Sequence, residues 1–340
     1  MAYTNLVNQY ALDKSEVFRR VRDFICKRNG SFDYSTTGIG WTLHDSSYVV
    51  DEDNLTANDY FVIKSNGENG KLDLYYQFIF DATANYLNIR GYSYWDNVTH
   101  TGYNNFNATD DWYVLESTEQ NIWVYGDLDF ISLISNQVGT TTRNSCLMGW
   151  LKDSDRDSTI AISSAAISSG TNVVVTLDLV PSSWQVGSKV LIRDNQNLQW
   201  SSVTNISGTD VTFNDISTPF AAGCKFALDY VVILQNQRNP TAANAMSLLY
   251  SHTSSTNQVS TIIYNTNILA HMTPESLNNE YLVVRPRLGA GSVGYYGSLP
   301  DSLLISAASI DDNTVYTTDI GVNYRQLDVY SGFYILFKEV

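Results

Sequence analysis

Short runs in which apolar and polar side chains alternate constrain this chain more than any other feature. In the run 72–80, every second residue is apolar and would face one side of an extended strand: Leu72, Leu74, Tyr76, Phe78 and Phe80. The segment 65–70 just before it holds an Asn-Gly pair and a second glycine, which favour a tight turn. Strands separated by such short turns predict antiparallel β structure, a meander or a sandwich, rather than an α/β sheet.

The same pattern recurs along most of the chain. It predicts strands in the first half at 60–64, 86–92, 121–125 and 130–135, and in the last third at 259–264, 280–285, 302–307, 314–317, 324–330 and 333–338. We therefore expect a mainly β protein, an antiparallel sandwich or barrel, with one N-terminal amphipathic helix and an inserted small β-domain.

The helix is predicted at residues 14–28. Asp13 and Glu16 have the spacing of a capping box, and Asn29-Gly30 supplies a stop. Five apolar residues fall on one face at helical spacing: Val17, Phe18, Val21, Phe24 and Ile25. The opposite face carries basic residues and is expected to be in solvent. A second helix is plausible at 240–250.

Residues 158–228 form a strand-and-turn series of their own. Strands are expected at 173–180, within 184–194, and at 201–206, 210–213 and 222–226, with glycines at the corners. This series interrupts a larger one that resumes at about residue 230. We therefore predict a small barrel or compact sandwich at 158–228, inserted into a main β-rich domain made of residues 1–157 and 229–340.

The composition favours an assembly protein. Charged residues make up 16% of the chain, against about 25% in an average soluble protein. The chain also holds 23 tyrosines, and subunit interfaces accept Tyr and Trp while excluding Lys and Glu. The net charge of −15 repels nucleic acid, so we expect no direct nucleic-acid binding. Six of the twenty basic residues lie within the first thirty positions. This basic stretch is interpreted as a solvated helix face, with a functional patch as the alternative.

Three widely spaced cysteines predict no disulfide framework and suit folding in a reducing cytoplasm. The start of the chain lacks the pattern of a signal peptide. The chain as a whole contains no run of about eighteen apolar residues, so we expect no membrane segment.

The sequence offers no motif that announces catalysis. None of the four histidines has a metal-ligand spacing, and neither a phosphate-binding loop nor a nucleophile elbow occurs. The alternating acids at 153–157 lack the Gly and Glu of a calcium loop, so a polar linker is the better interpretation. We therefore assign no catalytic residue, metal or cofactor. Exposed tryptophans could stack on sugars, but core or interface anchoring is the stronger alternative. The candidates are Trp95, Trp112 and Trp123.

Several turn and strand motifs carry a resemblance. They are Gly40-Trp41, the stretch 59–70, Leu72 to Tyr76, Arg90 to Trp95, Gly294 to Gly297 and Gly321 to Tyr324. In these, the chain resembles structural proteins of tailed bacteriophages and prophages from the neck (collar), tail or baseplate. The resemblance covers the first 135 and the last 60 residues best. It implies a virion component, ring-forming or tail-attached, made in the cytoplasm of the bacterial host.

The expected function is thus a non-enzymatic structural component of a tailed-phage virion. It would form or decorate an oligomeric ring at the neck, tail or baseplate, and its partners would be copies of itself and other virion proteins. The candidate interface residues are Arg19, Arg20, Arg22, Trp95, Trp112 and Trp123. The alternative is a receptor- or glycan-binding module of a tail fibre. A third possibility, a cell-wall-degrading enzyme, needs a catalytic cluster that the sequence does not display.

Overall fold

The computed structural model confirms a mainly antiparallel β protein with one N-terminal helix. Strands dominate, and all the strand pairs between described residues are antiparallel. The structure describes residues 2–5, 14–26, 38–47, 55–81, 83, 86–103, 110–113, 120–138, 144–150, 159–228, 232–237, 245–248, 275–277, 281–284, 287–290, 294–298, 302–305, 315–317, 321–330 and 333–338. No helix in these ranges has the length and apolar character needed to span a membrane.

The helix α1 (Lys14–Cys26) follows the predicted amphipathic pattern. The five apolar residues at helical spacing, from Val17 to Ile25, are fully buried. Its observed end at Cys26 lies two residues before the predicted one, and the proposed capping residue Asp13 lies outside the described residues. Burial of five large apolar side chains along one stripe explains why this segment is helical.

The opposite face of α1 corrects the sequence analysis, which placed its basic residues in solvent. Arg20 is 6% exposed and Arg22 only 1% exposed. Arg20 pairs with Glu16 at 2.8 Å, and Arg22 pairs with its neighbour Asp23 at 2.5 Å. The Nζ of Lys14 donates to the carbonyl of Asp81. Tertiary packing therefore covers the helix on several sides, and local ion pairs make burial of its cations tolerable.

The first sheet of the body has the strand order β2-β3-β4-β5-β8. Its strands are β2 (Thr42–Ser46), β3 (Tyr60–Ser65), β4 (Leu74–Ile79), β5 (Tyr86–Tyr92) and β8 (Asp110–Tyr113). The alternating residues predicted for 72–80 all belong to one buried core, as their period of two requires. Phe18 of α1 packs edge-on against Phe61 at 4.7 Å between ring centres, which fixes the helix on this sheet.

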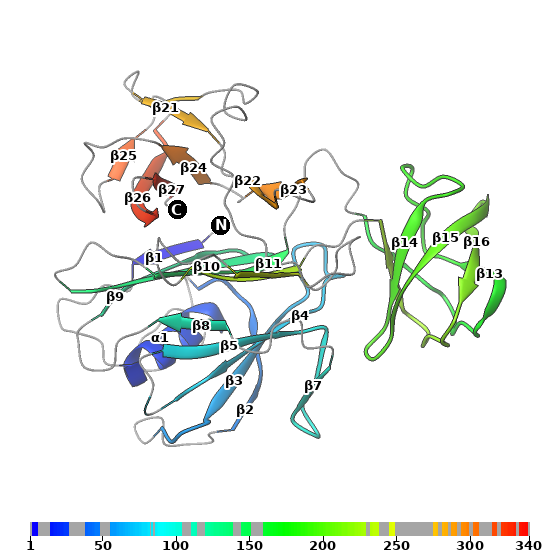
Figure 1. Ribbon diagram of the computed structural model, residues 1–340, viewed down its shortest axis with the longest axis horizontal. Helices are drawn as coiled ribbons and strands as arrows, with labels where there is room; N and C mark the ends of the chain where they lie inside the picture. The colour runs from blue at the N-terminus through cyan, green and yellow to red at the C-terminus, as the bar shows by residue number, and fades with distance from the viewer. Residues whose placement is uncertain are drawn as a thin grey trace.

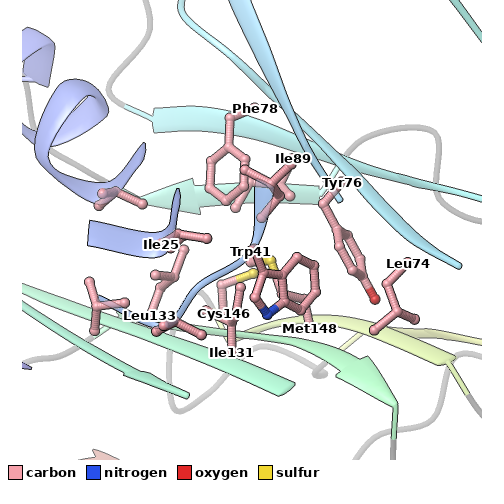
Figure 2. Close-up of a cluster of buried hydrophobic side chains, with 14 of the residues drawn as sticks. Ile25, Trp41, Leu74, Tyr76, Phe78, Ile89, Ile131, Leu133, Cys146 and Met148 are labelled. Carbon is pink, nitrogen blue, oxygen red and sulfur yellow. The ribbon is translucent and has the colours of Figure 1, made fainter. Parts of the chain in front are cut away.

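The second sheet has the strand order β1-β9-β10-β11-β18-β19. It consists of β1 (Ala2–Asn5), β9 (Gln120–Gly126), β10 (Phe130–Gln137), β11 (Asn144–Trp150), β18 (Val232–Gln237) and β19 (Ala245–Leu248). Both sheets and α1 enclose the core (Figure 1). Figure 2 shows Ile131, Leu133, Cys146 and Met148 facing Tyr76 and Phe78, with Trp41 between them. We call these two sheets and α1 the body.

Strand β19 lies where a second helix was expected, at 240–250, so that expectation is wrong for residues 245–248. This segment pairs antiparallel with β18, with Ile233 opposite Leu248 and Asn236 opposite Ala245. The edge of β18 offers a row of backbone partners, and such tertiary pairing overrides a weak local helical preference.

Residues 160–228, here called the barrel, form a sheet and a core of their own. The strand order is β12-β17-β14-β15-β16-β13. The strands are β12 (Ala161–Ile162), β13 (Gly170–Thr176), β14 (Lys189–Arg193), β15 (Leu198–Ser207), β16 (Asp210–Ile216) and β17 (Lys225–Ala227). The N–H of Ser164 donates to the carbonyl of Thr176, and the N–H of Asp178 donates to the carbonyl of Ile162. These hydrogen bonds connect the edge strands β12 and β13, so the sheet closes into a barrel.

The barrel leaves the body and returns to the same sheet. Strand β11, before it, pairs directly with β18, after it, from Ser145–Gln237 to Trp150–Val232. Figure 1 shows the barrel standing to one side of the body. The division into a main domain of residues 1–157 and 229–340 and an inserted domain at 158–228 stays a prediction. Whether the barrel folds independently stays a prediction.

The C-terminal strands form a further sheet of order β20-β21-β24-β27-β26-β25. These are β20 (Glu275–Leu277), β21 (Tyr281–Val284), β24 (Ser302–Ile305), β25 (Val315–Thr317), β26 (Asn323–Tyr330) and β27 (Phe333–Lys338), with a separate pair β22 (Arg287–Ala290) and β23 (Gly294–Ser298). The strands predicted from residue 280 onward coincide with these elements. The strand predicted at 259–264 lies outside the described residues.

Candidate functional site at the cleft between body and barrel

The segment 71–73 of the body makes polar contacts that hold the barrel against the body. Leu72 points inward and is fully buried in the body core. Its neighbours Lys71 and Asp73 point the other way, because side chains alternate along extended backbone. The Nζ of Lys71 donates to the carbonyl of Ile160 at 2.8 Å and to the carboxylate of Asp178 at 2.9 Å. The segment 71–73 therefore packs into the body core through Leu72 and binds the barrel through Lys71.

Asp73 joins two cations of the barrel. Its Oδ2 lies 3.1 Å from Nη2 of Arg193 and 2.5 Å from Nζ of Lys225. Strands β14 and β17 pair with Arg193 directly opposite Lys225, so the two cations are neighbours. Like charges in that position repel. A carboxylate from the body therefore neutralises a repulsion built into the barrel.

The charge state of Lys225 reflects this balance. Burial lowers the pKa of its ammonium below the usual value, the Asp73 carboxylate opposes that change, and the nearby Arg193 reinforces it. The pKa of Asp178, which pairs with Lys71 in the same contact between body and barrel, is also lowered, but for a carboxyl this change favours the charged form. Burial works against its charge, but the N–H of Ile162 and the Lys71 ammonium outweigh burial and lower its pKa.

Apolar contacts reinforce these ion pairs. Ile160, Leu191 and Ala227 of the barrel belong to the same buried cluster as the body core, and Trp200 packs against it. The inner core of the barrel forms a separate cluster, in which Phe213 stacks on Phe226 at 5.3 Å. The barrel therefore has its own interior and a second, outward apolar face that docks on the body.

A cavity of about 340 Å³ opens beside the Asp73 cluster. The body contributes Tyr94 and Asp96 to its wall, and the barrel contributes two turns, 194–197 and 221–224. The carboxylate of Asp194 fastens these turns together. It accepts the N–H of Asn197 at 2.7 Å from its own turn and the N–H of Ala221 at 2.9 Å from the other.

The body wall of the cavity is a hairpin, β6 (Tyr94–Asp96) and β7 (Thr101–Tyr103), which packs beside an aromatic cluster on the outer face of the first sheet. Tyr92 and Trp95 form the centre of this cluster with a ring separation of 5.2 Å. Gly102 lies so close that a Cβ there would come within 2.3 Å of the Tyr92 ring. Only glycine lets the hairpin approach.

Asp45 fastens the hairpin to β2. Its Oδ2 accepts hydrogen bonds from Nε1 of Trp95 at 2.7 Å and the Tyr60 hydroxyl at 3.3 Å, and lies 2.9 Å from Nδ1 of His100. Burial, with the charge of Asp45 and its hydrogen bond, raises the pKa of Tyr60 to about 12. The phenol therefore stays protonated and donates to the carboxylate at neutral pH.

The structure places most of the candidate interface residues inside the folded chain. Trp95 is 3% exposed and Trp123 is 2% exposed, so neither ring is open to a ligand or partner. Arg20 and Arg22 are buried as described above. Arg19 is half-buried on α1. Trp112 lies on β8 opposite Leu87, and its side chain lies outside what the structure describes.

The cleft residues were missed by the sequence analysis. Asp73 lies more than a hundred positions before both Arg193 and Lys225, and the three meet only because β14 and β17 pair and then dock on residue 73. The available signal was weak. Two residues of opposite charge, Lys71 and Asp73, flank a core leucine, and this pattern occurs wherever a strand lies near the surface.

The three cysteines, Cys26, Cys146 and Cys224, are free thiols in the structure. Burial raises the pKa of Cys224 to about 11, so it remains protonated at neutral pH. Within the described ranges, no group of three His, Cys, Asp or Glu side chains is placed to hold a metal ion.

No model of a known protein family matches this chain. A search of curated proteins also finds no match.

Proposed function

We propose that this chain is a non-enzymatic structural component of a tailed-phage virion. It forms or decorates an oligomeric ring at the neck, tail or baseplate, with copies of itself and other virion proteins as partners. It is made in the cytoplasm of the bacterial host and then incorporated into the particle. The proposal rests on the resemblance of its turn and strand motifs to virion proteins and on the build of the chain.

The observation that carries the proposal is the lateral barrel. Strands β11 and β18 pair with each other, and the barrel between them stands to one side of the body (Figure 1). A closed ring of identical subunits uses two different patches per copy, one for the preceding and one for the following neighbour. The body and the barrel docked on it supply two such separate surfaces in one chain.

The composition supports the same function. Few charged side chains have to be desolvated when this chain meets a partner, since only 16% of its residues are charged. The barrel also exposes apolar side chains, with Val174 61% exposed and Val186 65% exposed.

Two of the perturbed groups, the Tyr60 phenol and the Cys224 thiol, suit a structural better than a catalytic role. A general acid or base works best with a pKa near the operating pH. The pKa of Tyr60 is about 12 and that of Cys224 is about 11, so both remain protonated near neutrality. Both side chains are engaged in hydrogen bonds that hold strands together, with Asp45 and Ser163 respectively.

The alternative function, a glycan-binding tail-fibre module, was based on three tryptophan rings. Trp95 and Trp123 are buried, so two of the three cannot form an exposed platform. We therefore place the ring-forming role first.

The decisive experiment combines oligomeric state with location. The purified chain of 38.0 kDa should elute as a closed oligomer with a mass that is a whole multiple of the monomer, measured by light scattering after gel filtration. Electron cryo-microscopy of the virions that carry it should find its density in a ring on the tail axis. A chain that remains monomeric at high concentration and is missing from the particles would refute the proposal.

A single variant tests whether α1 takes part in the interface. Arg19 is the one candidate arginine of α1 with a partly exposed side chain. Arg19→Glu should reduce incorporation into particles without lowering the melting temperature, and Arg19→Lys should not. Equal incorporation of both variants would remove α1 from the interface.

A further inference from the structure

The cavity between body and barrel has the chemical character of a binding site for a neutral polar ligand. Its volume of about 340 Å³ falls at the lower end of the range for small-molecule sites, which begins at roughly 300 Å³. Its lining combines one aromatic ring, three side-chain amides, three carboxylates and two cations. Such a lining offers both hydrogen-bond donors and acceptors around a stacking surface.

Tyr94 supplies the stacking surface. Its ring is half-buried and contacts two other tyrosines, with ring centres 5.9 Å from Tyr75, which it meets edge-on, and 5.8 Å from Tyr103. These neighbours fix the ring in place before any ligand arrives. A preformed aromatic face of this kind accepts the apolar C–H face of a saturated ring at little entropic cost.

Asp96 and Asn195 supply hydrogen-bonding groups on opposite walls. The N–H of Val98 donates to Asp96 at 2.8 Å and lowers the pKa of its carboxyl, so Asp96 is ionised and accepts only. A carboxylate has room for further donors after these bonds. Asn195 is exposed at the tip of a turn that Asp194 holds rigid, and its amide both donates and accepts.

The charges of the cavity argue against an ionic ligand. Arg193 and Lys225 are both committed to Asp73, and Asp194 is occupied by backbone N–H groups. Asp96 is then the main uncompensated charge in the wall, and the whole chain carries −15. This field repels phosphate and sulfate. Among the described residues, no three His, Cys, Asp or Glu side chains are grouped so that they could hold a metal ion, and this holds for the cavity wall too.

We propose that this cleft binds a short neutral saccharide, stacked on Tyr94 and hydrogen-bonded through its hydroxyls to Asp96 and Asn195. Hydroxyl groups donate and accept, so they match a carboxylate on one wall and an amide on the other. The proposal differs in place from the tryptophan platform that the sequence suggested. It goes beyond the structural role proposed above and does not depend on it.

The test uses the intact chain. A library of neutral mono- and oligosaccharides is screened, and the strongest binder is measured by titration calorimetry. Tyr94→Ala should weaken binding by about tenfold or more, whereas Tyr94→Phe keeps the ring and should stay within about twofold. Asn195→Ala should weaken binding by about fivefold. Gln185→Ala removes an exposed amide from another turn of the barrel, outside the cavity lining, and should change nothing.

Asn195→Ala guards against an effect on folding, because it removes an exposed side chain from a turn, whereas Tyr94→Ala also removes contacts to two neighbouring rings. Any of three results would overturn the proposal: no saccharide binding by the intact chain at millimolar concentration, equal effects of Asn195→Ala and Gln185→Ala, or binding of inorganic phosphate or sulfate in the cleft instead of sugar.

Discussion

Replacing Asp73 by alanine should loosen the barrel from the body without unfolding either. The variant removes the carboxylate that lies between Arg193 and Lys225 and leaves these two cations facing each other across paired strands. Body and barrel each keep a core of their own. The lost free energy should therefore fall on their docking.

The expected cost follows from burial. The Arg193 side chain is 5% exposed and that of Lys225 is 17% exposed. Water can therefore do little to solvate these two cations once the Asp73 carboxylate is removed. Removing one partner of a fully buried ion pair costs about 3–5 kcal/mol. Asp73 itself is 23% exposed, and water entering its place repays part of this. We expect about 2–3 kcal/mol, between the buried and exposed cases.

Lys225 adds a dependence on pH. Its folded-state pKa is already below the usual 10.5, and losing Asp73 lowers it further. Between the folded and unfolded pKa values the unfolded lysine binds a proton that the folded one has released, so stability rises with pH. The deficit of Asp73→Ala should therefore shrink as the pH is raised toward 10.5.

Denaturant titration and amide hydrogen exchange together measure the effect. Exchange should accelerate in β17 and in the segment 71–73, while the inner strands of the body remain protected. The matched control is Asp178→Asn. It removes a charge from the more exposed pair with Lys71 but keeps the acceptor for Ile162, and it should cost less than about 1 kcal/mol.

A double variant sharpens the argument. Lys225→Met in the Asp73→Ala background removes the repulsion and should restore part of the lost stability. The reasoning is refuted if Asp73→Ala costs no more than Asp178→Asn, or if the double variant is less stable than the single one.

Four further outcomes are expected. Stability should fall as the pH rises above 10, because the pKa of Tyr60 is raised from 10.0 to about 12 in the folded chain and the unfolded phenol ionises first. A series of melting temperatures against pH should show a smaller loss for Tyr60→Phe. Asp45→Ala should cost about 2–4 kcal/mol by chemical denaturation, since the Trp95 indole N–H and the Tyr60 hydroxyl lose their acceptor, and a cost under 1 kcal/mol would contradict the described network. Arg22→Glu should prevent folding, as seen by circular dichroism, because it places a second carboxylate beside the buried Asp23, whereas a soluble, native-like variant would show that this side chain is not buried. Replacing residues 158–228 by a short Gly/Ser linker should leave a folded but less stable body, and a molten remainder would show that the predicted boundary is wrong.

The fold class followed from local patterns in the sequence. The alternation in 72–80 predicted one buried face, and all its apolar members lie in the body core. The limits predicted at 86–92 match β5, whereas the alternating run 72–80 forms the shorter strand β4, Leu74–Ile79. The helix was also predictable, because five apolar residues at helical spacing have no other way to share one buried stripe. Period and turn chemistry are properties of neighbouring residues.

Burial of polar residues was decided only by the tertiary structure. The basic face of α1 looked like a solvent face because Arg20 and Arg22 lie opposite the apolar stripe, yet packing covers both. Residues 245–248 became a strand because β18 offered a partner edge. Neither outcome depends on the local sequence alone.

The cleft shows the same limit most clearly. Lys71 and Asp73 were ordinary surface charges in the sequence, and Arg193 and Lys225 ordinary strand residues. Pairing of β14 with β17 brings the two cations together, and docking of the barrel sets Asp73 between them. The sequence by itself determined which segments extend or coil, because that depends on contacts between near neighbours. Only the tertiary structure determined which charges meet, because that depends on how strands distant in sequence pair and pack.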